Sequence, residues 1–142
     1  MTTPPRPPAP PRTVLVVDDE PALRRVLERL LARLGYRVLS AGSAEAAYEL
    51  LGRERPDALL LDVRLPTMSG LALYLLIVHR WPALKGRIAI MTGDAEEAEV
   101  RTWIEHHRCP VIRKPFNVQE VSDWLREVER LAAEQQRGEA EA

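Results

Sequence analysis

Three acidic side chains, one hydroxyl and one ammonium group each end or directly follow a short apolar run of the sequence. They are, in chain order, Asp18, Asp19, Asp62, Thr92 and Lys114. Carboxylates that share one crevice repel each other and raise each other's pKa values unless a cation is present. Mg²⁺, a hard cation with oxygen ligands, is the usual choice where phosphate chemistry follows, and Lys and Thr can hold phosphoryl oxygens. Together these residue types indicate phosphoryl transfer to an Asp side chain.

These groups can meet only if the segments that bear them form one sheet, and the sequence favours such a sheet. Short apolar runs alternate with segments whose apolar residues recur every three or four positions. The runs predict strands over 13–17, 36–40, 58–61, 88–91 and 111–112. The first run is a short continuous apolar stretch, as in a strand buried on both faces of a parallel sheet.

The segments that follow these strands have the start and stop signals of helices. Pro21 opens and Gly35 closes an apolar stripe over 23–34. Ser43 can cap a second helix, and a third is expected over about 70–80. Two further helices are expected after the capping pairs Asp94 with Glu97 and Asn117 with Glu120.

The alternation predicts an α/β fold, (βα)5, in which helices cover both faces of a doubly wound, parallel, five-stranded sheet. In such a sheet the carboxyl ends of the strands lie at one edge, and ligands bind there at the topological switch point. We therefore expect the acidic residues, the threonine and the lysine to converge at this edge.

Four stretches of the sequence resemble the receiver domain of two-component response regulators. They are VLVVDDEPALRRVLERLL, LLLDVRLPTMSG, IAIMTGD and IRKPF, within about four fifths of the chain from Thr13 to Arg130. Pro66 and Gly70 follow Asp62 at the family's spacing. The resemblance implies a flavodoxin-like sheet with the strand order 2-1-3-4-5.

The resemblance also implies a role for each residue at the sheet edge. Asp62 would accept the phosphoryl group, Lys114 would pair with it, and Thr92 would bond one of its oxygens and move inward. Asp18 and Asp19 would hold Mg²⁺, and Asp62 would contribute to the same metal site.

Further positions follow from the same resemblance. The backbone carbonyl of Arg64 would complete the metal ligands, and the bond between Lys114 and Pro115 would be cis. Arg64 and Asp94 would lie at positions that tune hydrolysis of the phosphorylated residue. Glu20 is expected to be a charge at the helix start rather than a metal ligand.

The function implied is that of a bacterial, cytoplasmic signalling switch. A histidine kinase or phosphotransfer protein would donate the phosphoryl group to Asp62 in a Mg²⁺-dependent reaction, and the output would pass to a protein target. The domain would assist its own phosphorylation and dephosphorylation without being a conventional enzyme. Two alternatives stay open: the receiver portion of a hybrid histidine kinase, and a receiver-like interaction module that works without phosphorylation.

Other enzyme classes fit poorly. A haloacid dehalogenase-type phosphatase needs a second Asp two residues after the nucleophile, where this chain has Arg64. Neither the dinucleotide-binding motif G-x-G-x-x-G nor the P-loop motif occurs.

The chain departs from the family pattern at two places. Val111 stands where the family often has the Tyr or Phe that reports phosphorylation, so the usual readout is in doubt. The helix after Gly70 is apolar nearly all round over 71–78, whereas a surface helix normally keeps a polar face. Leu75 and Leu76 on this helix could be covered by the fold, or could contact a partner or a second copy in a homodimer.

A few other side chains invite interpretation. Trp124 could be peripheral core or a partner anchor, Trp103 is expected in the core, and Cys109 is expected to be a small buried residue. The histidines 79, 106 and 107 lack ligand spacing with carboxylates and are interpreted as solvated or packing residues.

Composition limits the remaining classes of protein. The 142 residues include 20 Lys and Arg against 21 Asp and Glu, a balance that gives no support to direct nucleic-acid or membrane binding. One cysteine excludes an internal disulfide, and no apolar run reaches the ~18 residues of a membrane span.

We expect a Pro-rich disordered leader over 1–12, one receiver domain over 13–131 and a charged, fraying tail over 132–142. From this length we expect the receiver domain to fill the chain, without a DNA-binding output domain.

Overall fold

The computed structural model of the protein describes residues 12–93 and 98–141. The expected leader lies almost entirely outside these residues, and so do the capping pair and the hydrolysis-tuning position that involve Asp94. Across the described residues no helix is long and apolar enough to cross a membrane.

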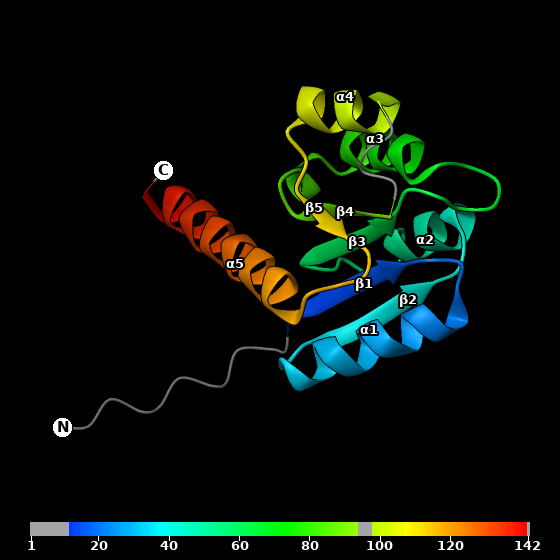
Figure 1. Ribbon diagram of the computed structural model, residues 1–142. Coiled ribbons are helices and arrows are strands. Elements are labelled where there is room, and N and C mark those ends of the chain that lie inside the picture. The colour runs from blue at the N-terminus through cyan, green and yellow to red at the C-terminus, as the bar shows by residue number, and fades with distance from the viewer. Residues whose placement is uncertain (1–11, 94–97, 142) are drawn as a thin grey trace.

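Five parallel strands form one sheet at the centre of the fold (Figure 1). They are β1 (Thr13–Val17), β2 (Arg37–Ala41), β3 (Ala58–Asp62), β4 (Ile88–Thr92) and β5 (Val111–Arg113). The strand order is β2-β1-β3-β4-β5, which confirms the flavodoxin-like (βα)5 topology expected from the family resemblance. Every residue of β3 and β4 is buried, because helices cover both faces of the sheet.

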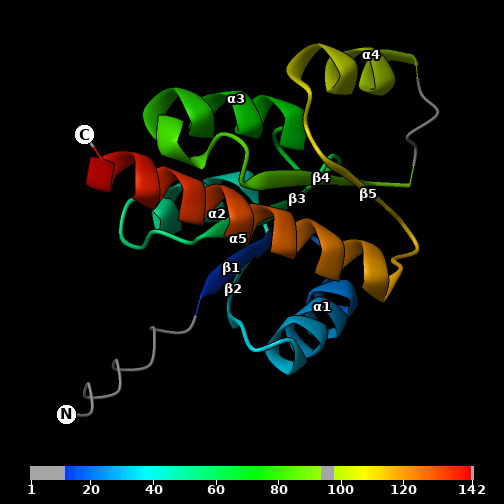
Figure 2. The same ribbon diagram turned by 90° about the vertical axis from the view of Figure 1, so that its left-hand side faces the viewer.

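Five α-helices lie in two layers on opposite faces of the sheet, as the two views in Figures 1 and 2 show. One layer contains α1 (Pro21–Arg33) and α5 (Val118–Glu141). The other contains α2 (Ala44–Leu51), α3 (Gly70–Arg80) and α4 (Ala98–His107), and a short 3₁₀ turn, η1 (Pro82–Leu84), follows α3. The alternation of strands and helices predicted from the sequence is therefore confirmed.

Each layer of helices packs on the sheet through its own hydrophobic core. Leu15, Leu59 and Ile77 belong to the core beneath α2, α3 and α4. Val16, Leu60 and Trp124 belong to the core beneath α1 and α5. Successive residues of one strand thus point into different cores, which explains why these strands are continuously apolar.

The capping residues named from the sequence stand at the helix starts that the structure describes. Ser43 Oγ accepts a hydrogen bond from the Ala46 amide at 3.1 Å, and Asn117 Oδ1 accepts one from the Gln119 amide at 2.8 Å. Gly35, with a φ of +94°, follows the end of α1 in the left-handed region that favours glycine.

Several surface details differ from the sequence-based expectation. Val26, within the expected apolar stripe over 23–34, is 56% exposed, and Val118, the first residue of α5, is 54% exposed. Residues 132–141, expected to fray, continue α5, and Arg87 donates a hydrogen bond to Gln135 in this part of the helix at 2.7 Å.

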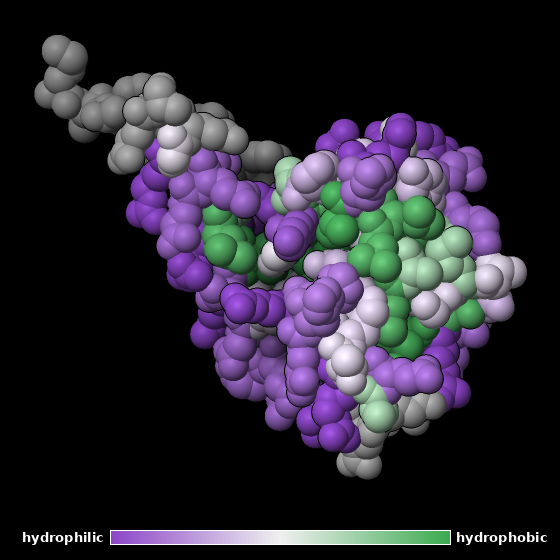
Figure 3. All heavy atoms as spheres, turned by 90° about the horizontal axis from the view of Figure 1, so that it is seen from above, coloured by the Kyte–Doolittle hydropathy of each residue, from purple (hydrophilic) through white to green (hydrophobic). Residues whose placement is uncertain are grey.

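The apolar helix α3 is only half covered by the fold. Leu73, Tyr74 and Ile77 are buried, whereas Leu75 and Leu76 are 43% and 44% exposed. Figure 3 shows a broad apolar area on the side of the molecule where α3 and α4 lie. The expectation that the fold covers this helix thus holds for one face, and contact of the other face with a partner or a second copy stays a prediction.

Candidate functional site

The residues singled out at the strand ends meet at the carboxyl edge of the sheet. Carboxylate oxygens of Asp18, Asp19 and Asp62 lie within 4.8 Å of one another. Lys114 Nζ lies 3.1 Å from Asp18 Oδ2 and 3.1 Å from Asp62 Oδ2. The prediction that residues of four different strand ends converge is confirmed, because Thr92 also lines this site.

Asp18 is the most deeply buried of the acidic residues and is held at several atoms. Its side chain is fully buried, and Oδ1 accepts a hydrogen bond from the Glu20 amide at 2.9 Å. Its backbone carbonyl accepts a hydrogen bond from Arg24 Nη1 at 2.6 Å, and its amide donates to the Ala41 carbonyl at 3.1 Å. The structure therefore fixes this carboxylate beside Lys114.

Asp62 ends β3 and turns one carboxylate oxygen toward the loop and the other toward Lys114. Oδ1 accepts from the Arg64 amide at 3.2 Å, and Oδ2 accepts from Lys114. Burial raises the pKa of Asp62, while the hydrogen bond and the charge of Lys114 act in the opposite direction, and the net direction is upward. Asp62 is thus a buried carboxylate at the edge of an open cavity, and both of its oxygens accept hydrogen bonds.

Lys114 follows β5, and its backbone is held by a hydrogen bond to β4 and by the peptide bond to Pro115. Its amide donates to the Thr92 carbonyl at 3.0 Å, and the expected cis bond to Pro115 is present. Burial lowers the pKa of this ammonium group, but the hydrogen bonds and charges of Asp18 and Asp62 raise it by more. Lys114 is therefore a permanent cation between two buried carboxylates.

A cavity of about 340 Å³ opens beside these groups. It is lined by Asp19, Glu20, Asp62, Val63, Arg64, Thr92, Gly93 and Lys114. Carboxylate, hydroxyl and ammonium groups thus share one solvent-accessible space, which is large enough for a phosphoryl group.

The loop after Asp62 closes on the strand end through Gly70. The Gly70 amide donates to the Val63 carbonyl at 2.8 Å. A Cβ at position 70 would lie 2.0 Å from the Asp62 carbonyl oxygen, so only glycine fits. The spacing of Asp62, Pro66 and Gly70 pointed to this loop, and the close approach supplies its physical reason.

The contact of Arg24 with the site was not expected from the sequence. Arg24 lies in the first part of α1, where its guanidinium reaches back to the Asp18 carbonyl. An arginine in the first part of a helix that begins just after an acidic pair is a weak signal, since solvated arginines at such positions are common.

The structure also gives the positions of Arg64 and Val111, which the family pattern had singled out. Arg64 lines the cavity, but its carbonyl is a metal ligand only by the family resemblance. Val111 is half buried on β5 and pairs in register with Ile90, so a small aliphatic side chain occupies the position that is often aromatic in the family.

Comparison with known proteins gives the same picture as the geometry. A sequence model described as the response regulator receiver domain matches residues 14–126. The probable transcriptional regulatory protein TcrX of Mycobacterium tuberculosis is 34% identical over 127 residues, which cover 82% of this chain and 49% of that protein.

Solved structures agree over most of the chain. The signal receiver domain of an HD domain-containing protein from Pseudomonas fluorescens is 26% identical, with a TM-score of 0.79 over 89% of this chain and 93% of that one. The response regulator TrrA of Thermotoga maritima, solved in complex with Mg²⁺ and BeF, is 26% identical, with a TM-score of 0.71 over 82% of this chain and 98% of that one.

The curated relatives are longer than this chain. The chain spans between about a fifth and a half of the length of the first relatives that it matches.

Proposed function

Because the chain belongs to the family of response regulator receiver domains of two-component signalling, we propose that it is a switch activated by phosphorylation of Asp62. The phosphoryl donor in this proposal is a histidine kinase or a phosphotransfer protein, and the output is a change in contact with a downstream protein. One observation carries the proposal: Lys114 Nζ lies 3.1 Å from Asp62 Oδ2, beside a cavity that the carboxylate shares with Thr92.

The acidic cluster fits a divalent cation. Carboxylate oxygens of Asp18, Asp19 and Asp62 lie within 4.8 Å of one another, and oxygen ligands of this kind suit Mg²⁺. We assign these three residues and the Arg64 carbonyl as the protein ligands of the ion. When bound, Mg²⁺ would neutralise negative charge on the phosphoryl oxygens.

In this proposal the transfer step takes place on the Asp62 carboxylate. An Asp62 oxygen forms a bond to phosphorus while the bond between phosphorus and the donor's imidazole nitrogen breaks, and the nitrogen keeps the electron pair. Lys114 already lies against Asp62 and holds an oxygen of the incoming group by a charge-assisted hydrogen bond. The domain thereby assists its own phosphorylation and, with water as the attacking group, its own dephosphorylation.

The signal passes outward from Thr92 in this proposal. Thr92 is 2% exposed at the end of β4 and moves toward the phosphoryl group, which shifts a pre-existing equilibrium between two conformations. Val111 on the neighbouring strand cannot reproduce the inward swing of a larger ring. We therefore expect the change at the surface to be small near β5.

Acetyl phosphate with Mg²⁺, followed by intact-mass measurement, tests the proposal. The wild type should gain the mass of one phosphoryl group, and Asp62→Asn should gain none. Asp123→Asn is a matched control, because Asp123 is an exposed carboxylate that accepts a hydrogen bond from Gln119, away from the acidic site.

The alternative of a module that works without phosphorylation makes the opposite prediction. In that case the wild type gains no mass, and beryllofluoride with Mg²⁺ leaves its tryptophan fluorescence unchanged. Phosphorylation that persists in Asp62→Asn would contradict the assignment of the acceptor residue.

A further inference from the structure

A second polar cavity, of about 470 Å³, lies at the opposite edge of the sheet from the acidic site. It is lined by Tyr74, Lys85, Gly86, His106, His107, Arg108, Cys109 and Pro110. These residues come from α3, from the turn before β4, and from the end of α4 with the segment that joins it to β5. The amino ends of β4 and β5 therefore form one side of this cavity, and the phosphorylation chemistry takes no part in it.

Tyr74 places an unpartnered hydroxyl in this cavity. The residue is 3% exposed, and its ring packs edge-on against Trp103 with the centroids 5.0 Å apart. Among the described residues the hydroxyl has no hydrogen-bond partner. Because the hydroxyl is not among the buried polar atoms that lack a partner, it is open to the cavity and is free to donate a hydrogen bond to a molecule bound there.

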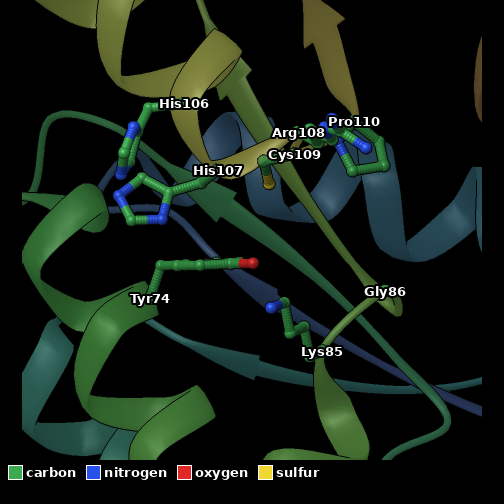
Figure 4. Close-up of a pocket in the computed structure, with 8 residues that line it drawn as sticks. All are labelled: Tyr74, Lys85, Gly86, His106, His107, Arg108, Cys109 and Pro110. Atoms are coloured by element: carbon green, nitrogen blue, oxygen red, sulfur yellow. The ribbon is translucent and has the colours of Figure 1, made fainter.

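The other polar groups of the cavity are basic. Lys85, His106, His107 and Arg108 line it, and no Asp or Glu of the described residues does. Figure 4 shows the Tyr74 hydroxyl and the Lys85 ammonium group pointing toward one another, with His107 on the same side of Tyr74 as Cys109. Lys85 also has no ion-pair partner among the described residues.

The backbone brings Arg108 to this place at a conformational cost. Its φ of 51° lies in the left-handed region, which a residue with a Cβ adopts rarely. The Cys109 amide closes the turn by donating to the Ile104 carbonyl at 3.3 Å, a helix ending that usually has glycine at the preceding position. The chain thus keeps a positively charged residue where glycine would be easier to accommodate.

We propose that this cavity binds a small oxyanion, a phosphate or carboxylate group, with the Tyr74 hydroxyl and the Lys85 ammonium group as its main donors. The volume is within the range of small-molecule sites. The pKa of His107 is lowered, first by burial and then by the nearby positive charges of His106 and Lys85, which agrees with the basic lining of the cavity.

A metal ion is a poorer fit to the same residues. Among the described residues, the sole group of His, Cys, Asp or Glu that could hold an ion is Asp18 with Asp19 and Asp62. Burial also raises the pKa of the Cys109 thiol to about 12, so that it is not a thiolate ligand near neutral pH.

Anion binding can be followed at the lysines, because Lys85 and Lys114 are the only two in the chain. Selective ¹⁵N labelling of lysine gives two amide signals, one for each cavity. Inorganic phosphate and acetate, titrated separately without Mg²⁺, test the two oxyanion classes. We expect the Lys85 signal to shift and saturate with at least one of them, whether or not Lys114 responds.

Two substitutions test the assigned donors. Tyr74→Phe keeps the ring packing and removes only the hydroxyl, and it should weaken binding roughly tenfold, as expected for a lost hydrogen bond to a charged group. Tyr48→Phe removes a hydroxyl from α2, outside this cavity, and should leave binding unchanged. Lys85→Gln, followed through histidine-labelled protein, should abolish saturation, whereas Arg25→Gln on α1 should not.

The proposal is overturned if neither anion shifts the Lys85 signal, or if Tyr74→Phe binds as tightly as the wild type. Its outcome is separate from that of the proposed phosphorylation. Failure of Asp62 to accept a phosphoryl group leaves the Lys85 titration unaffected, and the reverse also holds.

Discussion

Gly70 lies directly against the backbone carbonyl of Asp62: a Cβ at position 70 would be 2.0 Å from that oxygen. The first residue of α3 is thereby packed onto the last residue of β3, and the loop between them is held at the mouth of the acidic site. The sheet edge and the helix start cannot separate without moving the carboxylate.

Gly70→Ala should therefore destabilise the protein. The added methyl group meets backbone atoms rather than a flexible side chain, so the loop must shift, and we expect a loss of about 1–3 kcal/mol in the free energy of unfolding. Urea denaturation measures the loss. Gly138→Ala is the control, because position 138 in α5 has no atom within 4 Å of an added Cβ, and alanine there should stabilise the helix. Equal effects of both substitutions would contradict the packing argument.

Lys114→Gln should destabilise the protein by removing the cation between two buried carboxylates. The Asp18 side chain is fully buried and that of Asp62 is 9% exposed, so their charges would be left unpaired. We expect a loss of about 1–3 kcal/mol, measured by urea denaturation without divalent ions. Addition of Mg²⁺ should restore part of it, because the ion replaces the lost positive charge.

Two controls accompany this measurement. Lys85→Gln removes the other lysine, which is exposed, and should change stability little. The double variant Lys114→Gln/Asp62→Asn should be more stable than Lys114→Gln alone, because one of the unpaired carboxylates is neutralised. A double variant that is less stable than Lys114→Gln would show that charge repulsion is not the cause.

Cys109 should give the protein a specific sensitivity to alkaline pH. Burial raises the pKa of its thiol from 9.0 to about 12, and Sγ lies 3.4 Å from the Ile88 carbonyl. Between these two pKa values the folded state keeps the proton that the unfolded state loses. This contribution to stability is present below pH 9 and is lost as pH rises toward 12, with a slope of at most about 1.4 kcal/mol per pH unit.

Denaturation of wild type and Cys109→Ala at several pH values measures this effect. The difference in the free energy of unfolding between the two proteins should change steadily above pH 9 and stay constant below it. Thiol reagents should modify Cys109 rapidly only in the unfolded protein. Rapid modification of the folded protein at neutral pH would contradict the burial of this thiol.

Much of the fold followed from the sequence because of how the strands are buried. A strand covered on both faces must be apolar throughout, so the runs around Leu15, Leu60 and Ile90 were visible without any contact information. Their ends were visible too, because polar residues such as Asp62 and Thr92 stop the runs at the sheet edge. Because the carboxyl ends of parallel strands lie at one edge of a sheet, the meeting of these polar residues at the site was predictable from the sequence.

Other features depend on contacts that the sequence does not specify. Val26 belongs to the same apolar stripe over 23–34 as Leu27, yet Val26 is 56% exposed whereas Leu27 is fully buried. The hydrogen bond from Arg24 to the Asp18 carbonyl depends on the angle at which α1 leaves the strand. The cavity around Tyr74 joins three separate segments, and neither spacing nor composition connects them.

Leu75 and Leu76 should make the protein self-associate through α3. Both side chains are more than two fifths exposed, and Leu76 borders an apolar cavity of about 490 Å³ that Tyr48 and Met68 also line. Association would remove this apolar surface from water, which is favourable at roughly 25 cal/mol per Å² of buried apolar area.

Light scattering at increasing concentration should show dimers for the wild type, and only monomers for Leu75→Glu/Leu76→Glu. The matched control is Val26→Glu/Val118→Glu, which places two charges at exposed valines of α1 and α5, away from α3, and should still dimerise. A wild type that stays monomeric would show that these leucines are not a self-association surface.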